Sequence, residues 1–375
     1  MTLSRKKILF IVNLPSPYRI DFFNELGKEC DLSVAFEGER ASNRNSKWVG
    51  DKAKNFTAIH LNGIRIRKEG FLSFKILKIL KKKWDFIFLG GYSTPTLMIA
   101  IEYLKQKGIP FLLEVDGGMI ASDSGLKYRV KRHFISAASA WMTTGNTTTD
   151  FLVHYGAKRD RCILYPFSSI KDKDILFSSI SDKRVFCENR DKIRREAKKR
   201  IGVHHGKLLL AVGQIIPRKG YDILLQSLSG ITYDVELIII GGEPTKDLLA
   251  YIIENKINNV RFIDFLIKEE LSEYYKAADI FIHPTREDIW GLVINEAMAN
   301  AVPVITTNKC VAGIELIRDG VNGKIVQSDN SKELTSAINE MLSMNLDSLG
   351  FNAMRTAKNY TIETMAKKHV EIIEK

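Results

Sequence analysis

The stretch from His283 to Thr307, HPTREDIWGLVINEAMANAVPVITT, decides the fold of the second half of the chain. An apolar run ends at His283, a polar loop follows, and helical spacing of apolar residues begins at about Gly291. A further apolar run covers 304–306. The pattern predicts a strand, a helix and a second strand, which is typical of a parallel sheet buried on both faces.

The same alternation of strand and helix continues outward from this stretch over most of the chain, with a weaker pattern at 165–182. A length of 375 residues also predicts two or three domains. The expected fold class is therefore α/β, with two doubly wound domains whose strands present their carboxyl ends to one cleft. The expected boundaries are 1–168 for the first domain, 169–200 for a linker with a basic helix, 201–351 for the second domain and 352–375 for helices packing back on the first.

The loop and helix start inside this stretch carry the groups of an anion site. The first amides of the helix, on Gly291, Leu292 and Val293, have no acceptor within the helix, so they and the helix dipole favour a diphosphate. Glu296 lies one turn further on, where its carboxylate can accept hydrogen bonds from vicinal hydroxyls. Asp288 lies eight residues earlier, in the loop. Hydroxyls that flank a diphosphate are the mark of a nucleotide sugar.

A second stretch, AVGQIIPRKGYDILLQSL at 211–228, places two cations at the same kind of strand end. A strand is expected to end at Val212, and Arg218 and Lys219 follow just before a helix. Charge-assisted contacts to phosphate are worth about 1.5 to 3 kcal/mol each, against about 0.3 to 1 for a helix dipole alone. The two cations and the helix start can therefore hold a leaving diphosphate without a metal.

These two stretches resemble retaining glycosyltransferase family 4 (glycosyl transferases group 1), whose members have the GT-B fold and a Glu-x7-Glu motif. Asp288 stands where Glu is commoner, and Glu287 precedes it, so either could contact the donor sugar; the spacing to Glu296 favours Asp288. Trp290 matches the aromatic of the motif. Gln214, after Gly213, replaces the usual Arg, which leaves Arg218 as the candidate to supply that charge.

The resemblance implies further site residues at three other strand ends. Gly242 and Glu243 match a turn of the donor site, and Phe265 and Leu266 match the segment beside the nucleotide base. The loop and first helix at 15–26 resemble the acceptor region, with four candidate residues there: Ser16, Pro17, Tyr18 and Arg19. Asp116 falls where members carry a His or Asp near the reacting centre; alternatively it caps a helix from Met119 onward.

The charge of the chain is uneven. The formal net charge is +12, and residues 1–168 hold 27 basic and 15 acidic side chains, whereas the rest hold 29 of each. This pattern argues against a nucleic-acid channel and favours an anionic partner of the first domain, such as a membrane surface. The stretch 71–84, FLSFKILKILKKKW, predicts a basic amphipathic helix for that surface or, equally, a core-packing helix with a lysine face.

The resemblance implies a retaining transfer of a sugar from a nucleoside diphosphate donor to a hydroxyl of a glycan. In many relatives the acceptor is lipid-linked and belongs to cell-surface polysaccharide synthesis. No cofactor or metal is expected. The scattered cysteines and the short first apolar run predict a cytoplasmic protein. The charge of the first domain adds the hypothesis that the protein is peripheral on the inner face of the membrane. Two alternatives remain open: a nucleotide-sugar epimerase of the same architecture, and a basic, non-catalytic membrane or nucleic-acid adaptor.

Overall fold

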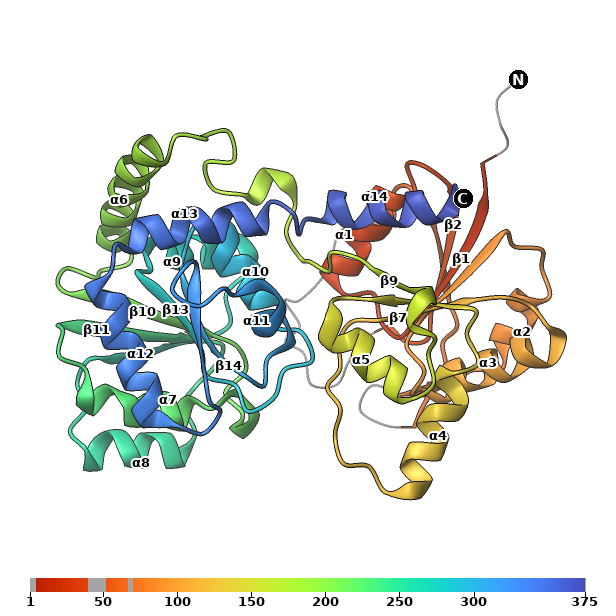
Figure 1. Ribbon diagram of the computed structural model, residues 1–375, viewed down its shortest axis with the longest axis horizontal. Coiled ribbons are helices and arrows are strands. Elements are labelled where there is room, and N and C mark those ends of the chain that lie inside the picture. Colours follow the sequence, from red (N-terminus) through yellow and green to blue (C-terminus); the bar gives the residue numbers. More distant parts are fainter. Residues whose placement is uncertain (1–4, 40–51, 67–69, 375) are drawn as a thin grey trace. The chain divides into compact units, whose positions relative to one another are not determined.

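The computed structural model describes residues 5–39, 52–66 and 70–374. The chain forms two compact units, one of residues up to Ser169 together with those from Thr361, the other of Ile170–Tyr360. Each unit is built around its own parallel sheet (Figure 1). The polar composition of 37–56 predicts a long loop, and most of that range lies outside the described residues.

Within the described part of the first unit, seven strands pair in the order β3-β2-β1-β6-β7-β8-β9, and every pair is parallel. Their interiors are apolar because helices cover both faces. A small antiparallel pair, β4 and β5, stands apart. The strands are β1 Lys7–Val12, β2 Asp31–Phe36, β3 Thr57–His60, β4 Ile64–Arg65, β5 Phe71–Leu72, β6 Phe86–Gly90, β7 Leu112–Val115, β8 Ala140–Thr143 and β9 Cys162–Leu164. The helices before the crossing to the second unit are α1 Pro17–Leu26, α2 Lys75–Leu80, α3 Pro95–Lys107, α4 Gly125–Ile135 and α5 Asn146–His154.

The last helix, α14 (Ile362–Ile373), returns to the first unit and packs against α1 (Figure 1). Thr361 caps it, and Met365 and His369 are buried in the contact. The helix before it, α13 (Leu346–Ala357), packs on α10 and α6 and belongs to the second unit. The expectation that 352–360 would also pack on the first domain is therefore corrected, because the apolar face of α13 is buried in the second unit.

In the second unit, the described strands pair in the order β12-β11-β10-β13-β14-β15, again all parallel. The strand order reverses between β10 and β13, and ligands of such sheets bind at the carboxyl ends of the strands beside that point. The strands are β10 Lys207–Val212, β11 Val235–Ile240, β12 Val260–Ile263, β13 Ile280–His283, β14 Val304–Thr307 and β15 Gly323–Val326. The helices are α6 Lys183–Arg200, α7 Tyr221–Ser227, α8 Lys246–Glu254, α9 Lys268–Ala277, α10 Leu292–Ala299, α11 Val311–Leu316, α12 Ser331–Ser343 and α13.

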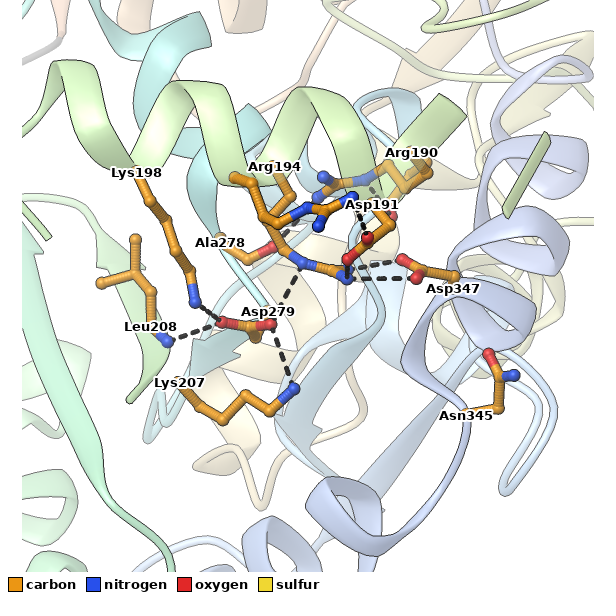
Figure 2. Close-up of polar contacts among 12 residues, drawn as sticks. Arg190, Asp191, Arg194, Lys198, Lys207, Leu208, Ala278, Asp279, Asn345 and Asp347 are labelled. Atoms are coloured by element: carbon orange, nitrogen blue, oxygen red, sulfur yellow. Dashed lines mark hydrogen bonds and ion pairs between the residues drawn. The ribbon is translucent and has the colours of Figure 1, made fainter. Parts of the chain in front are cut away.

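The basic helix α6 is an integral part of the second unit, although 169–200 was expected to be a linker. Arg190 is buried and donates to the carbonyls of Lys276, Ala278 and Ala301, so it caps the chain after α9 and after α10 (Figure 2). Arg194 pairs with Asp347 at the start of α13. Arg190 and Arg194 are thus buried in the packing of the unit, whereas most of the other basic residues of this helix are exposed.

The basic stretch at 71–84 forms a strand, β5, and a helix of only six residues, α2. Ile76, Ile79 and Leu80 are buried in the core of the first unit, while Phe74 is exposed. The structure therefore favours the core-packing alternative for this stretch, because its apolar face is occupied. Across the residues that the structure describes, no helix is both long and apolar enough to cross a membrane.

Candidate functional site

The loops after β10 and β13 touch at the carboxyl edge of the second sheet. The loop after β10 contains a 3-10 turn, Pro217–Lys219, and then Gly220 with φ of 69°. A Cβ at Gly220 would lie 2.0 Å from the carbonyl oxygen of Pro284, so only glycine allows this approach. The Arg218 carbonyl also accepts hydrogen bonds from the Arg286 amide, at 2.8 Å, and from the Thr285 hydroxyl, at 3.0 Å. This contact brings the two sequence-predicted cations to the motif of residues 283–296.

Asp288 is the centre of a charged cluster at this edge. Its Oδ2 atom lies 2.6 Å from the Lys219 Nζ atom and 3.0 Å from the His283 Nε2 atom. The Arg218 guanidinium is 3.8 Å from the other carboxylate oxygen. Burial opposes ionisation of Asp288, but the hydrogen bond from His283 and the charge of Lys219 hold its pKa well below the ordinary value.

His283 is the buried member of this cluster. Its side chain is 2% exposed, and burial together with the nearby Lys219 lowers its pKa, so the ring is neutral at pH 7. A neutral ring that meets a carboxylate donates from Nε2, which fixes the Asp288 carboxylate in place. His283 is not among the site residues predicted from the sequence. The signal available was the position of His283 at a strand end, five residues before Asp288.

Glu287 and Asp288 point to different surroundings. Glu287 is exposed, and its backbone carbonyl accepts hydrogen bonds from Arg218, at 2.5 Å, and from the Thr285 hydroxyl, at 2.9 Å. Asp288 is 12% exposed and holds Lys219. Of the two acids that the motif left open, the structure thus brings Asp288 into the cation cluster and leaves the Glu287 side chain outside it.

The start of α10 depends on a glycine. Gly291 has φ of 102°, and a Cβ there would lie 2.7 Å from the Cys310 sulfur. The helix begins at Leu292, and Leu292 and Val293 are half-buried. Trp290, expected to contact the donor, is only 2% exposed and donates from Nε1 to the Asn295 side chain at 2.9 Å. Its indole therefore supports the helix start from inside, and its contact with the donor stays a prediction.

Glu296 lies one turn into α10 and accepts a hydrogen bond from the Tyr275 hydroxyl at 3.0 Å. Burial and the neighbouring Glu296 raise the pKa of Tyr275 well above its ordinary value, so the tyrosine stays a donor. Tyr275 was not predicted, because it comes from α9 and no local pattern in the sequence marks it. This hydrogen bond holds one oxygen of the Glu296 carboxylate, which is half-buried.

The remaining donor candidates follow strands of the same sheet, also at its carboxyl edge. Gly213 follows β10 and Gly242 follows β11; a Cβ at Gly241 would lie 2.2 Å from the Gly213 carbonyl oxygen, so these two loops also touch. Gln214 is half-buried and Glu243 is exposed. Phe265 and Leu266 follow β12 and are half-buried. All of the predicted donor residues thus lie along one edge of the second sheet.

In the first unit, the acceptor candidates surround a buried arginine. Pro17 is the first residue of α1, and Ser16 precedes it. Arg19 is buried and binds Glu114 and Asp116, each at 2.5 Å. Its guanidinium also lies 5.8 Å from the Tyr18 ring centroid. Arg19 therefore holds two carboxylates, and its expected contact with an acceptor stays a prediction.

Asp116 follows β7 and keeps 27% of its side chain exposed. Tyr165 donates to the same carboxylate at 3.3 Å. No helix starts at Met119 in the described chain; α4 begins at Gly125. The alternative of a helix cap is therefore wrong, because the carboxylate is engaged by Arg19 and Tyr165 at the carboxyl edge of the first sheet.

Glu37 directly follows β2 at this edge and was not predicted as a site residue. It is fully buried and accepts a hydrogen bond from the Thr94 hydroxyl at 2.6 Å. Burial raises its pKa to about 7 from 4.5. The folded protein thus binds a proton that the unfolded chain releases, and stability falls as the pH rises from about 4.5 to 7.

We expect Glu37→Gln to remove this pH dependence. A shift of this size corresponds to about 3 kcal/mol, so the variant should equal wild type near pH 4.5 and exceed its unfolding free energy by up to about 3 kcal/mol at pH 8. Urea unfolding at several pH values measures the difference. Glu39→Gln, at the exposed Glu39, is the matched control and should change little; equal curves for Glu37→Gln and wild type would contradict the assignment.

Groups of three or more His, Cys, Asp and Glu side chains that could hold a metal do not occur in the described parts of the chain. The charged groups at the two sheet edges are instead paired with one another. The cluster in the second unit can bind an anion through Lys219, Arg218 and the α10 amides, and hydroxyls through its two carboxylates.

Two parallel, doubly wound sheets, one with a cation cluster and a glycine-started helix at its carboxyl edge, define the GT-B class of fold. Solved structures have the same fold over nearly the whole chain. The structure of Anabaena HepE in complex with UDP matches with a TM-score of 0.76 and 17% identity, covering 98% of this chain and 99% of that one. Its complex with UDP-glucose matches with a TM-score of 0.73 and 18% identity, over the same shares of both chains.

Residues 193–362 match the family model described as Glycosyl transferases group 1, so the second unit carries a domain of this family. Among curated proteins, an uncharacterized glycosyltransferase of Methanocaldococcus jannaschii is 27% identical over 157 residues, 41% of this chain and 44% of that protein. The lipopolysaccharide glucosyltransferase WaaG of Escherichia coli K12 is 25% identical over 241 residues, 60% of each chain. The chain spans about half the length of the curated relatives it matches.

Proposed function

We propose that this protein is a retaining, metal-independent glycosyltransferase that moves a sugar from a uridine diphosphate sugar to a hydroxyl of a glycan. The observation that carries the proposal is the cluster of Lys219, Arg218 and Asp288 beside the glycine-started helix α10. It combines cations for a diphosphate with a fixed carboxylate for sugar hydroxyls. The UDP and UDP-glucose complexes of HepE support the choice of donor.

In the proposed reaction the bond between the anomeric carbon and the diphosphate oxygen breaks, and the electron pair stays on that oxygen. Lys219, Arg218 and the first amides of α10 stabilise the charge that develops there. Asp288, fixed by neutral His283, accepts hydrogen bonds from donor-sugar hydroxyls, and Glu296 accepts from the ribose. The acceptor hydroxyl attacks the same face of the sugar, and its proton passes to the leaving phosphate oxygen. This route keeps the anomeric configuration and needs no protein nucleophile.

The acceptor side of the proposal concerns the first unit. Asp116 is partly exposed at the carboxyl edge of its sheet, where it can accept a hydrogen bond from an acceptor hydroxyl. The whole excess of positive charge lies in residues 1–168, which supports a lipid-linked acceptor and a peripheral position on an anionic membrane. The cell-surface polysaccharide context rests on the WaaG relative.

A transfer assay with radiolabelled donors tests the proposal. Purified protein with UDP-sugars and a lipid-linked glycan should release UDP and give a larger glycan with retained configuration. Formation of an isomeric nucleotide sugar without acceptor would indicate an epimerase instead, and binding without any turnover would indicate an adaptor. Flotation with vesicles of anionic and of neutral lipids tests the membrane: preference for the anionic vesicles supports it, and equal binding contradicts it.

Gly291→Ala is expected to weaken UDP binding about tenfold or more. The new Cβ would meet the Cys310 sulfur and would also require φ of 102°, so the first amides of α10 must shift. Isothermal titration with UDP measures the effect. Gly320→Ala is the matched control, because Gly320 has φ of 69° but open space around its Cβ. Equal UDP affinity of the two variants would argue against the helix start as the diphosphate site.

A further inference from the structure

Four side chains form one buried charged cluster in the first unit, here named the buried tetrad: Arg19, Glu114, Asp116 and His369. Arg19 on α1 binds both carboxylates, and the second oxygen of Glu114 lies 2.8 Å from the Nε2 atom of His369 on α14. Glu114 and His369 are fully buried, although they are 255 residues apart in the chain. The tetrad explains what α14 contributes to this unit beyond its apolar contacts.

The hydrogen bonds of His369 determine its charge. Its Nδ1 atom lies 2.8 Å from the backbone carbonyl oxygen of Met365, which can only accept. Its Nε2 atom faces Glu114. Burial opposes ionisation of Glu114, but Arg19 and His369 lower its pKa below the ordinary value, so it is a carboxylate that also only accepts. A neutral imidazole has one N–H and cannot donate to both partners. Both ring nitrogens must therefore carry hydrogen.

With His369 as an imidazolium, the net charge of the buried tetrad is zero. Arg19 and His369 then supply two positive charges against two carboxylates, in surroundings that are otherwise aromatic: the His369 ring lies 4.7 Å from the Phe22 centroid and 5.4 Å from that of Tyr165. An uncompensated charge in such surroundings is strongly unfavourable. Of the four groups, only Asp116 has substantial exposure, at 27%. The charges of the three buried members therefore set the electrostatic surroundings of Asp116, the member of the tetrad that is exposed enough to meet a ligand.

We propose that His369 is a positively charged positioning residue that neutralises Glu114 and so leaves the charge of Arg19 free to keep Asp116 ionised. The proposal rests on the function proposed above for Asp116, the hydrogen-bond acceptor of the incoming hydroxyl. The groups that face Asp116 are Tyr18 and Arg19 of α1, Glu114 of β7 and Tyr165 after β9, with His369 of α14 behind Glu114.

The pKa of Asp116 is raised above its ordinary value by burial and by the charge of Glu114, although Arg19 opposes this. Loss of the His369 charge should raise it further, because a nearby positive charge favours the carboxylate. Loss of the Glu114 charge should lower it. A residue that only packs would not give shifts of opposite sign in these two variants.

Nuclear magnetic resonance of the full chain tests both parts. With ¹⁵N-labelled histidine, both ring nitrogens of His369, assigned by their loss in His369→Gln, should carry hydrogen at pH 7. With ¹³C-labelled aspartate, the Asp116 carboxyl, assigned with Asp116→Asn, should titrate at higher pH in His369→Gln and at lower pH in Glu114→Gln. His133→Gln, at a half-exposed histidine on α4, is the control and should leave Asp116 unchanged.

A single protonated ring nitrogen at pH 7, or an unshifted Asp116 in His369→Gln, would overturn the proposal. If His369→Gln does not fold, the ring nitrogens of wild type, assigned through Glu114→Gln, and the shift of Asp116 in that variant decide it. None of these measurements needs transfer activity. Full transfer by Asp116→Asn would refute the proposed role of Asp116 but leave the charge of His369 to be judged by its own signals.

Discussion

Replacing Lys219 by alanine is expected to lower the kcat/KM of sugar transfer by about 100- to 1000-fold, which is the usual cost of removing one group that stabilises a developing anion. Lys219 is the cation closest to Asp288, at 2.6 Å, and is only 12% exposed. The more exposed Arg218, 3.8 Å from that carboxylate, is less well placed to replace it. A steady-state assay with a UDP-sugar donor measures the loss.

Separate values of kcat and KM for Lys219→Ala show whether Lys219 acts on the transition state or only on donor binding. If Lys219 acts on the charge of the departing diphosphate, most of the loss should fall on kcat, because the interaction strengthens in the transition state. Loss in KM alone would mean that the lysine only binds the donor. Lys332→Ala, at an exposed lysine on α12, is the control for a general loss of charge. Wild-type kcat/KM in Lys219→Ala would refute the site.

Much of the fold follows from local pattern. Short apolar strands that alternate with amphipathic helices predict parallel sheets, and such sheets place loop residues at one edge. This is why Lys219 and Asp288, 69 residues apart, could be expected near each other. The two-sheet architecture and the group 1 resemblance are confirmed.

The partners that hold the site residues could not be predicted in the same way. Tyr275 reaches Glu296 from another helix, and His369 reaches Glu114 across most of the chain. Neither contact leaves a period or a spacing in the sequence. The burial of Trp290 shows a related limit, because a motif gives the place of a residue in the chain but not how much of its ring is exposed.

The basic helix α6 shows that the sequence also does not reveal which acids pair with a run of basic residues. A run of eighteen residues with so many lysines and arginines suggests a solvated linker, because charges avoid burial unless paired. The pairing comes from distant acids, Asp279 at the start of β13 and Asp347 at the start of α13. Only the fold brings these acids to α6, and the sequence alone therefore could not separate a linker from a packed helix.

Asp279→Asn is expected to destabilise the second unit by about 3 to 5 kcal/mol, the cost of leaving buried charges without their partner. Asp279 is 1% exposed; it accepts from the Leu208 amide at 2.7 Å and pairs with Lys198 at 2.5 Å and Arg194 at 3.3 Å (Figure 2). A third cation, Lys207, lies 3.8 Å from the same carboxylate. Asparagine keeps the shape but removes the charge that all three cations face. Thermal and urea unfolding measure the loss.

Two further acids also pair with Arg194 and are more exposed than Asp279. Their substitution tests whether burial sets the cost of losing the charge. Asp347 is 17% exposed and pairs with Arg194 at 2.5 and 3.0 Å, so Asp347→Asn should cost less than Asp279→Asn. Asp191 is 41% exposed, and Asp191→Asn should cost at most about 1 kcal/mol, as for other surface pairs. The three substitutions remove the same charge next to the same arginine. Equal losses would mean that burial does not set the cost. A stable Asp279→Asn protein would mean that the buried charge of Asp279 does not help to hold α6 in place.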